Sequence, residues 1–231
     1  MHPIMEKIKS RGHWKIVIRP SAFMQNQIPE LSSCKTLIRD NKVQLRGWDY
    51  PHYDMNTGIN TGLDYVEQFS EFLDHIEAWR FYQSGQFIQY KALWEDWFEA
   101  RTNIGRQQQS LPNESLSITG TVYLLTEIYE FASRLGAKGI LGDSCEIQIT
   151  LFNTMNRKLK TFDSRRHLFA EYKTTLSEIP RLVPLKTTDL IGRSAELSLE
   201  HSVWLFQRFN WDGIQPETLK EDQRELLEKR L

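Results

Sequence analysis

The stretch His13-Trp14-Lys15-Ile16-Val17-Ile18-Arg19 consists mostly of β-branched and aromatic residues and predicts a β-strand. Pro20 follows and stops it, because proline lacks the backbone N–H that a strand donates. Apolar residues then recur at steps of three and four, which is the spacing of one helix face; they are Ile28, Leu31, Cys34 and Ile38. Residues 43–48 return to strand-like alternation. A strand, an amphipathic helix and a second strand in close succession predict a βαβ unit at the start of the fold.

Further elements are expected downstream of this unit. Residues 118–135 are apolar around much of the helix circumference and predict a central core helix. The remaining patterns predict a helix over 64–80 with one apolar and one acidic side, a strand over 86–93, a loop over 101–115, a β-hairpin over 146–162, a strand over 181–186, and helices over 189–209 and 216–231.

The fold class that these patterns predict is α+β. We expect a single domain with a mixed sheet that starts with the βαβ unit, a central apolar helix and a C-terminal helical segment. A chain of 231 residues fits one large domain or two small ones, and no internal repeat divides it. We therefore assign residues 1–211 to one α+β domain and residues 212–231 to a charged C-terminal helix or tail.

Composition excludes several classes of protein. Mean hydropathy is −0.51, and no apolar run approaches 18 residues, so we expect no membrane span. The net charge of −1 argues against a generic nucleic-acid coat protein, which would need a cationic excess. Residues 1–9 lack the apolar core of a secretory signal, and two cysteines are too few for a disulfide framework. These features predict a cytoplasmic location, with Cys34 and Cys145 as buried, reduced thiols.

The densest group of chemically active residues is Leu45-Arg46-Gly47-Trp48-Asp49-Tyr50-Pro51-His52. Arg19 and Arg46 end the two strands of the predicted βαβ unit, and open α/β sheets hold ligands at that edge. Two guanidiniums there suit a phosphate or a carboxylate. The predicted ligand site comprises Arg19, Arg46, Trp48, Asp49, Tyr50 and Arg80. The alternative is structural: both arginines pair with carboxylates, and the aromatic residues pack.

The segment of residues 77–87 is also dense in charged and aromatic residues. Arg80 flanks the apolar side of the predicted helix, and a buried arginine needs a carboxylate partner. Glu127 and Glu130 on the core helix are candidates. An ion-pair network is one interpretation, and a catalytic carboxylate cluster that includes Glu77 is the other. The sequence has no P-loop, dinucleotide fingerprint, nucleophile elbow or zinc-type spacing, and it specifies no cofactor.

Charge is unevenly distributed along the chain. Residues 1–19 carry five cations against one acid, and residues 155–173 carry six against two. Residues 63–80 have the opposite balance, with five acids against one cation. These segments are either solvated faces or docking surfaces for nucleic acid or for an acidic partner.

Four motifs carry a resemblance to a known group of proteins. They are Trp14-Lys15-Ile16-Val17-Ile18-Arg19-Pro20, Leu45-Arg46-Gly47-Trp48-Asp49-Tyr50-Pro51, residues 77–87 and Thr126-Glu127-Ile128-Tyr129-Glu130-Phe131-Ala132. The chain resembles, to about Trp211, a family of uncharacterised bacterial proteins. Some relatives carry or neighbour a Schlafen/AlbA-type domain and are described as putative DNA- or ATP-binding proteins. The resemblance implies no established activity, and no Schlafen-type domain is visible in this sequence.

The function that we expect is a non-enzymatic binding or regulatory module of a bacterial cytoplasmic system, related to defence or to nucleic acid. It would recognise an anionic or planar ligand and act with a protein partner. One alternative is a metal-dependent enzyme that acts on nucleic acid or nucleotides through Glu77, Glu127 and Glu130. The other is a purely structural protein-interaction subunit, in which Arg19 and Arg46 are paired and shielded from solvent.

Overall fold

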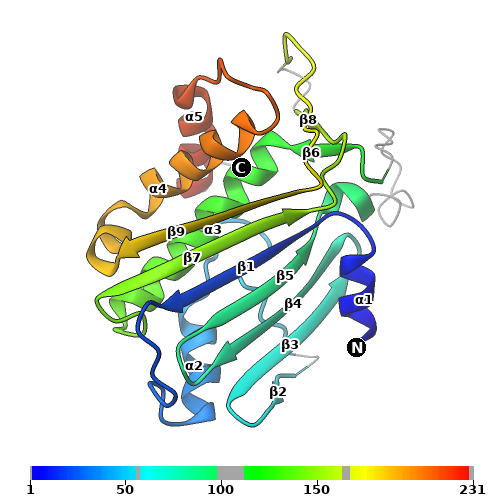
Figure 1. The fold of residues 1–231 in the computed structure, drawn as a ribbon. Helices are drawn as coiled ribbons and strands as arrows, with labels where there is room; N and C mark the ends of the chain where they lie inside the picture. The colour runs from blue at the N-terminus through cyan, green and yellow to red at the C-terminus, as the bar shows by residue number, and fades with distance from the viewer. Residues whose placement is uncertain (1, 56–57, 98–111, 163–166, 229–231) are drawn as a thin grey trace.

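The structure, a computed structural model, describes residues 2–55, 58–97, 112–162 and 167–228 (Figure 1). The helices in these ranges are α1 (Pro3–Lys9), α2 (Leu31–Asn41), α3 (Ile118–Ala137), α4 (Thr187–Gln207) and α5 (Pro216–Leu227). The strands are β1 (His13–Pro20), β2 (Asn60–Thr61), β3 (Tyr65–Phe72), β4 (His75–Tyr82), β5 (Phe87–Ala92), β6 (Ser115–Ser117), β7 (Ser144–Phe152), β8 (Lys158–Lys160) and β9 (Glu178–Lys186).

Within the described residues, seven strands form one sheet in the order β2-β3-β4-β5-β1-β7-β9. Every neighbouring pair in this sheet is antiparallel. Parallel pairing occurs between β6 and β8, which form a separate two-stranded sheet. The predicted α+β single domain is confirmed, but the main sheet is antiparallel rather than mixed.

Helices cover the two faces of the sheet very unequally. The helices α2, α3 and α4 lie on one face, and α1 packs on the other against β3, β4 and β5 (Figure 1). The inward side chains of β1, Trp14, Ile16 and Ile18, join Phe131 of α3 in one large apolar core. Because α3 is enclosed by the sheet and by α4, it is buried around most of its circumference, as its apolar pattern predicts.

The predicted βαβ unit is wrong at its third element. The strand β1 and the helix α2 form as expected, but residues 43–48 are not a strand. Val43 and Tyr50 instead bridge each other through backbone hydrogen bonds of 2.6 and 2.9 Å, so the segment between them is a closed loop. The strand-like alternation arises because this loop directs alternate side chains toward the core and toward a cavity described below.

The predicted helix over 64–80 is also wrong, because β3 and β4 form an antiparallel hairpin there. Leu73 at its tip has a φ of 54°. The sequences of β3 and β4 do not show the apolar–polar alternation of a strand, for two reasons. The inward face of β3 carries the buried polar residues Gln68 and Ser70, and β4 is covered on one face by the core and on the other by α1.

The hairpin predicted over 146–162 does not form either. The strand β7 pairs with β1 and β9, while β8 pairs with β6. Tertiary contacts decide this, since the buried Arg157 fixes the chain between β7 and β8 to a distant carboxylate, Asp96.

The charged helix α5 packs onto α3 and α4 through one side. Leu219 and Leu226 are buried there, and the amide of Gln223 donates to Thr126 Oγ1 (3.0 Å) and Ser198 Oγ (2.8 Å). Both cysteines are buried and free, as expected. Of the helices that the structure describes, none combines the length and the apolar character needed to cross a membrane. Most of the predicted loop over 101–115 lies outside the described residues.

Candidate functional site

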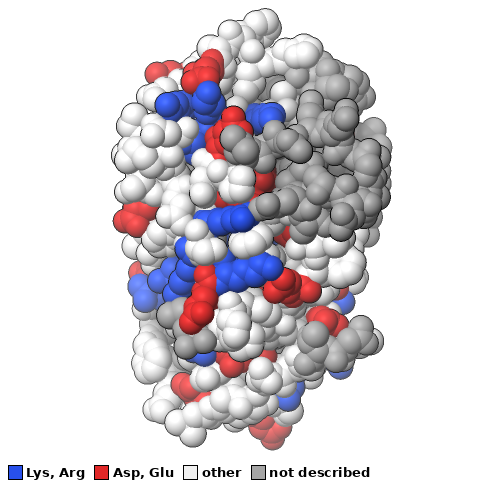
Figure 2. All heavy atoms as spheres, turned by 90° about the vertical axis from the view of Figure 1, so that its right-hand side faces the viewer, with Lys and Arg blue, Asp and Glu red and all other residues white. Residues whose placement is uncertain are grey.

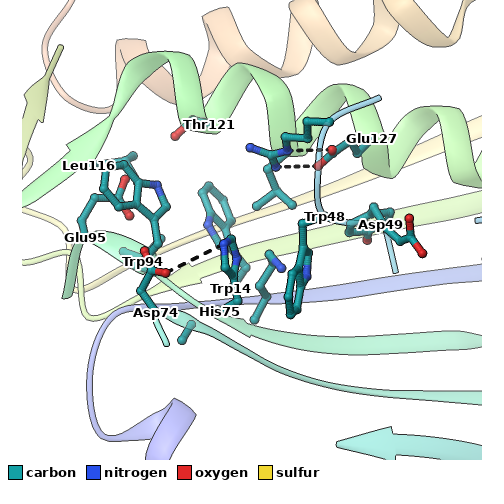
Figure 3. A pocket seen from close by; sticks show the side chains of 17 residues that line it. Trp14, Trp48, Asp49, Asp74, His75, Trp94, Glu95, Leu116, Thr121 and Glu127 are labelled. Carbon is teal, nitrogen blue, oxygen red and sulfur yellow. Dashed lines mark hydrogen bonds and ion pairs between the residues drawn. The ribbon is translucent and has the colours of Figure 1, made fainter. Parts of the chain in front are cut away.

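A narrow cavity of about 50 Å³ lies between the N-terminal half of α3 and the sheet (Figure 3). Its walls come from segments that are far apart in the sequence. They are Trp14 of β1, the loop of residues 46–50, the turn of residues 74–75, residues 91–95 at the end of β5, Leu116, and residues 120–127 of α3. The tertiary fold therefore assembles a site that no local stretch contains.

Four of the six predicted site residues line this cavity: Arg46, Trp48, Asp49 and Tyr50. The other two lie outside it, on the opposite face of the sheet. Arg19 donates to Glu146 across β1 and β7 (2.7 and 2.9 Å), and Arg80 donates to Glu67 across β4 and β3 (2.6 Å). Arg80 is exposed and does not reach Glu127 or Glu130, its expected partners.

Arg46 is held by Glu127 of α3 in a two-pronged ion pair. Its Nε donates to Oε1 at 2.8 Å and its terminal nitrogen donates to Oε2 at 2.6 Å. The Glu127 side chain is only 2% exposed, whereas that of Arg46 is 30% exposed. Burial raises the pKa of Glu127, and the charge of Arg46 offsets part of that rise. The Arg46 guanidinium therefore already has a carboxylate partner, Glu127, within the fold.

The second cation of the cavity, Lys91, also has a carboxylate partner within the fold. It lies directly opposite Glu77 in the β4–β5 ladder and forms an ion pair with it. Glu77 also accepts hydrogen bonds from the His52 backbone (2.8 Å) and from Gln89 (3.2 Å). Burial alone would raise the pKa of Glu77, but the charge and hydrogen bond of Lys91 hold it below its usual value.

These pairs bear on the carboxylate-cluster interpretation. Glu77 and Glu127 are neutralised by Lys91 and Arg46, and Glu130 accepts from Arg134 at 2.9 Å. Among the described residues there is no group of three or more His, Cys, Asp and Glu side chains that could hold a metal ion. The geometry thus favours an ion-pair network over a metal-binding cluster at these three positions.

Aromatic rings form much of the cavity wall. The ring of Trp48 stacks on His52 at 3.7 Å and on His75 at 4.4 Å. Trp14 and Trp94 line the same cavity (Figure 3). Flat apolar walls with polar edges suit a flat ligand.

Buried polar atoms around the cavity lack partners. Four such atoms have no hydrogen-bond partner among the described residues: Trp48 Nε1, Tyr50 Oη, Glu95 Oε2 and Thr121 Oγ1. An unsatisfied buried polar group costs about 1–3 kcal/mol. Groups of this kind are satisfied by water or by a polar ligand, so the cavity is a candidate binding site.

Glu95 is the most unusual member of the group. Its Oε1 accepts from the backbone N–H of Ser117 at 2.6 Å, which leaves Oε2 free at the cavity. Burial raises the pKa of Glu95 to about 7, against the opposing effects of the Ser117 hydrogen bond and the charge of Arg157. Near neutral pH this carboxyl group is therefore present both protonated, when it can donate a hydrogen bond, and ionised, when it can only accept.

Glu95 should make the stability of the protein depend on pH. Its folded-state pKa of about 7 lies above the ordinary 4.5, so its contribution is fully present below pH 4.5 and lost as pH rises through 7. The free energy of unfolding should fall by about 3 kcal/mol over this interval. Glu95→Gln, which resembles the protonated acid, should remove this fall and exceed the wild type at pH 8.

Urea denaturation at pH 4, 6 and 8 measures this effect. Glu178→Gln, at an exposed carboxyl on β9, is the matched control and should follow the wild type at each pH. Parallel curves for Glu95→Gln and the wild type would show that the pKa of Glu95 is not raised.

Sequence reasoning missed much of the cavity. The missed residues that matter most are Trp14, Lys91, Trp94, Glu95 and Thr121. A signal was present in Trp94-Glu95-Asp96-Trp97, where two acids stand between two tryptophans directly after a strand. Lys91 and Thr121 carry no local signal, because only their partners across the fold give them a role.

No protein-family model, curated protein or solved structure matches this chain. The resemblance to a family with Schlafen/AlbA-associated relatives therefore stays a prediction, and the site is interpreted from its own geometry.

Proposed function

We propose that this protein is a non-enzymatic binding module whose cavity takes a planar nitrogen heterocycle, such as the base of a nucleotide or of a nucleic-acid end. The observation that carries the proposal is the convergence of four unpartnered buried polar atoms on one tryptophan-lined cavity. Because the cavity volume is about 50 Å³, the loop of residues 46–50 would move outward to admit a ring. The ring would then lie against the tryptophan wall, and its N–H groups would donate to Glu95. The hydroxyls of Tyr50 and Thr121 would complete the polar contacts.

Charge favours a base over a phosphate in the cavity. The described lining residues include four carboxylates, Asp49, Asp74, Glu95 and Glu127, against the cations Arg46 and Lys91. Both cations already have carboxylate partners. A phosphate entering this space would face the free oxygen of Glu95 and would find both lining cations already paired, whereas an amino group could donate to that oxygen.

The wider roles in the hypothesis remain proposals. Membership of a bacterial cytoplasmic system and a protein partner rest on the sequence patterns alone. The alternative of a metal-dependent enzyme on nucleic acid or nucleotides is tested by incubating the protein with labelled oligonucleotides and nucleotides in Mg²⁺ or Mn²⁺. Turnover that is lost in Glu127→Gln would favour that alternative.

Removing the unpartnered hydroxyl of Thr121 tests the binding proposal. Thr121→Val keeps the shape of the side chain and removes a buried group that lacks a partner, so the free protein should become more stable by about 1 kcal/mol. The same change should reduce the thermal shift produced by nucleobases, nucleosides or nucleotides at least by half. The measurement is a thermal-shift panel, with titration calorimetry for any compound that responds.

Ser70→Ala is the matched control. It also removes a buried hydroxyl without a hydrogen-bond partner among the described residues, but Ser70 does not line the cavity. Its ligand response should equal that of the wild type. The proposal fails if no compound shifts the wild type, or if Thr121→Val and Ser70→Ala respond alike.

A further inference from the structure

Among the described residues, the sheet face opposite the cavity carries α1 at one end. This helix packs against β3, β4 and β5. Figure 2 shows Lys and Arg side chains forming a band across the side of the molecule on which α1 lies. Beside α1, a groove of about 330 Å³ runs over β4 and β5, and its lining includes His2, Lys9, Arg80, Tyr82 and Tyr90.

Tyr90 lines this groove and lies close to two lysines. Lys15 faces it across the β1–β5 ladder, with its Nζ 5.9 Å from the ring centroid, and Lys9 of α1 places its Nζ at 5.0 Å. Tyr90 and Tyr82 are partly exposed, so part of each ring reaches solvent. Two ammonium groups beside a partly exposed ring combine a phosphate-binding charge with a stacking surface.

The two lysines differ from their neighbours in having no acidic partner. Lys7 pairs with Glu71 and Arg80 pairs with Glu67, so those charges cancel locally. Neither Lys9 nor Lys15 forms an ion pair with a carboxylate in the described residues. Lys9 is close enough to His13 to lower the pKa of its imidazole, together with the larger effect of burial. Within the described part of the chain, no carboxylate pairs with these two lysines.

The edges of the sheet are poor alternatives for docking. In the described part of the chain, one edge is β2, with only two residues. The other is β9, which contains Pro180 and Pro184, and neither has an N–H to offer a new strand. Short edges and edge prolines disfavour strand addition by a partner. As far as the described residues show, the face beside α1 is the better docking surface of the sheet.

We propose that this groove, together with Lys15 beside it, binds single-stranded nucleic acid, with backbone phosphates at Lys9 and Lys15 and a base stacked on Tyr90. Proteins that bind single strands combine a cationic track with aromatic rings, and both are present here. Duplex DNA would bind less well, since its bases are stacked internally and do not reach a ring on a sheet face. The site is independent of the cavity, which lies on the other side of the sheet.

Fluorescence anisotropy of the full chain with labelled 12-nucleotide single-stranded DNA and RNA, in 50 mM salt, tests the proposal. Lys9→Glu/Lys15→Glu should weaken binding at least tenfold. The matched control, Lys138→Glu/Lys220→Glu, makes the same charge change at exposed lysines on or beside helices elsewhere, and should alter binding less than twofold. Tyr90→Leu should weaken binding at least fivefold, while Tyr90→Phe, which keeps a ring, should bind like the wild type.

The outcomes separate single-strand binding from a charge-only surface. Weaker binding to a 12-base-pair duplex, and a salt dependence that flattens in Lys9→Glu/Lys15→Glu, support the proposal. It is overturned if no single strand binds, or if the two charge-reversed pairs lose affinity equally. Equal binding of an oligoglutamate peptide, unaffected by Tyr90→Leu, would also overturn it and identify an acidic protein partner. Circular dichroism confirms that each variant is folded.

Discussion

Replacing Arg157 with Met is expected to lower the free energy of unfolding by about 3–5 kcal/mol, because it leaves a buried carboxylate without its cation. The Arg157 and Asp96 side chains are both fully buried. The guanidinium donates to the two Asp96 oxygens at 2.9 and 2.7 Å and to the Ser115 carbonyl at 2.7 Å. A hydrophobic replacement supplies none of these donors.

The surroundings of this pair show why the loss should be large. Asp96 also accepts from the backbone N–H groups of Gly12 and Asn113, both at 2.8 Å. A Cβ on Gly12 would lie 2.2 Å from the Arg157 guanidinium, so only glycine allows this approach. The pair therefore connects the start of β1, the end of β5 and the segments that precede β6 and β8.

Urea denaturation measures the effect, and the melting temperature should fall by about 10 °C. The control is Arg193→Met, which removes an exposed arginine paired with Glu196 and Glu200 and should cost less than about 1 kcal/mol. Arg157→Met/Asp96→Leu should recover part of the loss, since it leaves no unpaired charge at this pair. A loss below 1 kcal/mol for Arg157→Met alone would contradict the conclusion that the buried Arg157–Asp96 pair holds these segments together.

Lys91→Met should have the second largest effect, about 3 kcal/mol at pH 7, because Glu77 then keeps only the neutral donors of His52 and Gln89. The pH dependence distinguishes this cause from lost packing. In the wild type the pKa of Glu77 is lowered, so its stabilising effect is present above its unfolded-state pKa and lost as pH falls through the lowered value.

Without Lys91, burial should raise the pKa of Glu77 above its unfolded value. The variant should then lose stability as pH rises, and its deficit relative to the wild type should grow from pH 4 to pH 7. Lys91→Met/Glu77→Gln should remove this growth. Lys158→Met, which breaks the exposed pair with Glu171, is the control, and its deficit should be small at both pH values. A pH-independent deficit for Lys91→Met would indicate lost packing alone.

The candidate site shows how far local reasoning extends. The loop around Trp48 was recognisable because Arg46, Trp48, Asp49 and Tyr50 stand together in the sequence, and all four line the cavity. The predicted grouping of Arg19 with Arg46 needs two parallel strands, but residues 43–48 form a loop and β1 pairs with antiparallel neighbours. The partner of Arg46, Glu127, lies 81 residues away. Pairing over such distances leaves no periodic signal.

The sequence by itself determined the elements that are buried where their sequences are apolar, either on one face or around the circumference. These elements are β1, α2, β5, α3 and α4. It did not determine β3 and β4, because polar residues on the inner face and apolar residues under α1 disguise their alternation. Only the tertiary structure decided the antiparallel order of the strands and the membership of the cavity. Periodicity reports which side of an element is apolar, whereas a polar site is built from buried residues that interrupt that periodicity and meet only when the chain is folded.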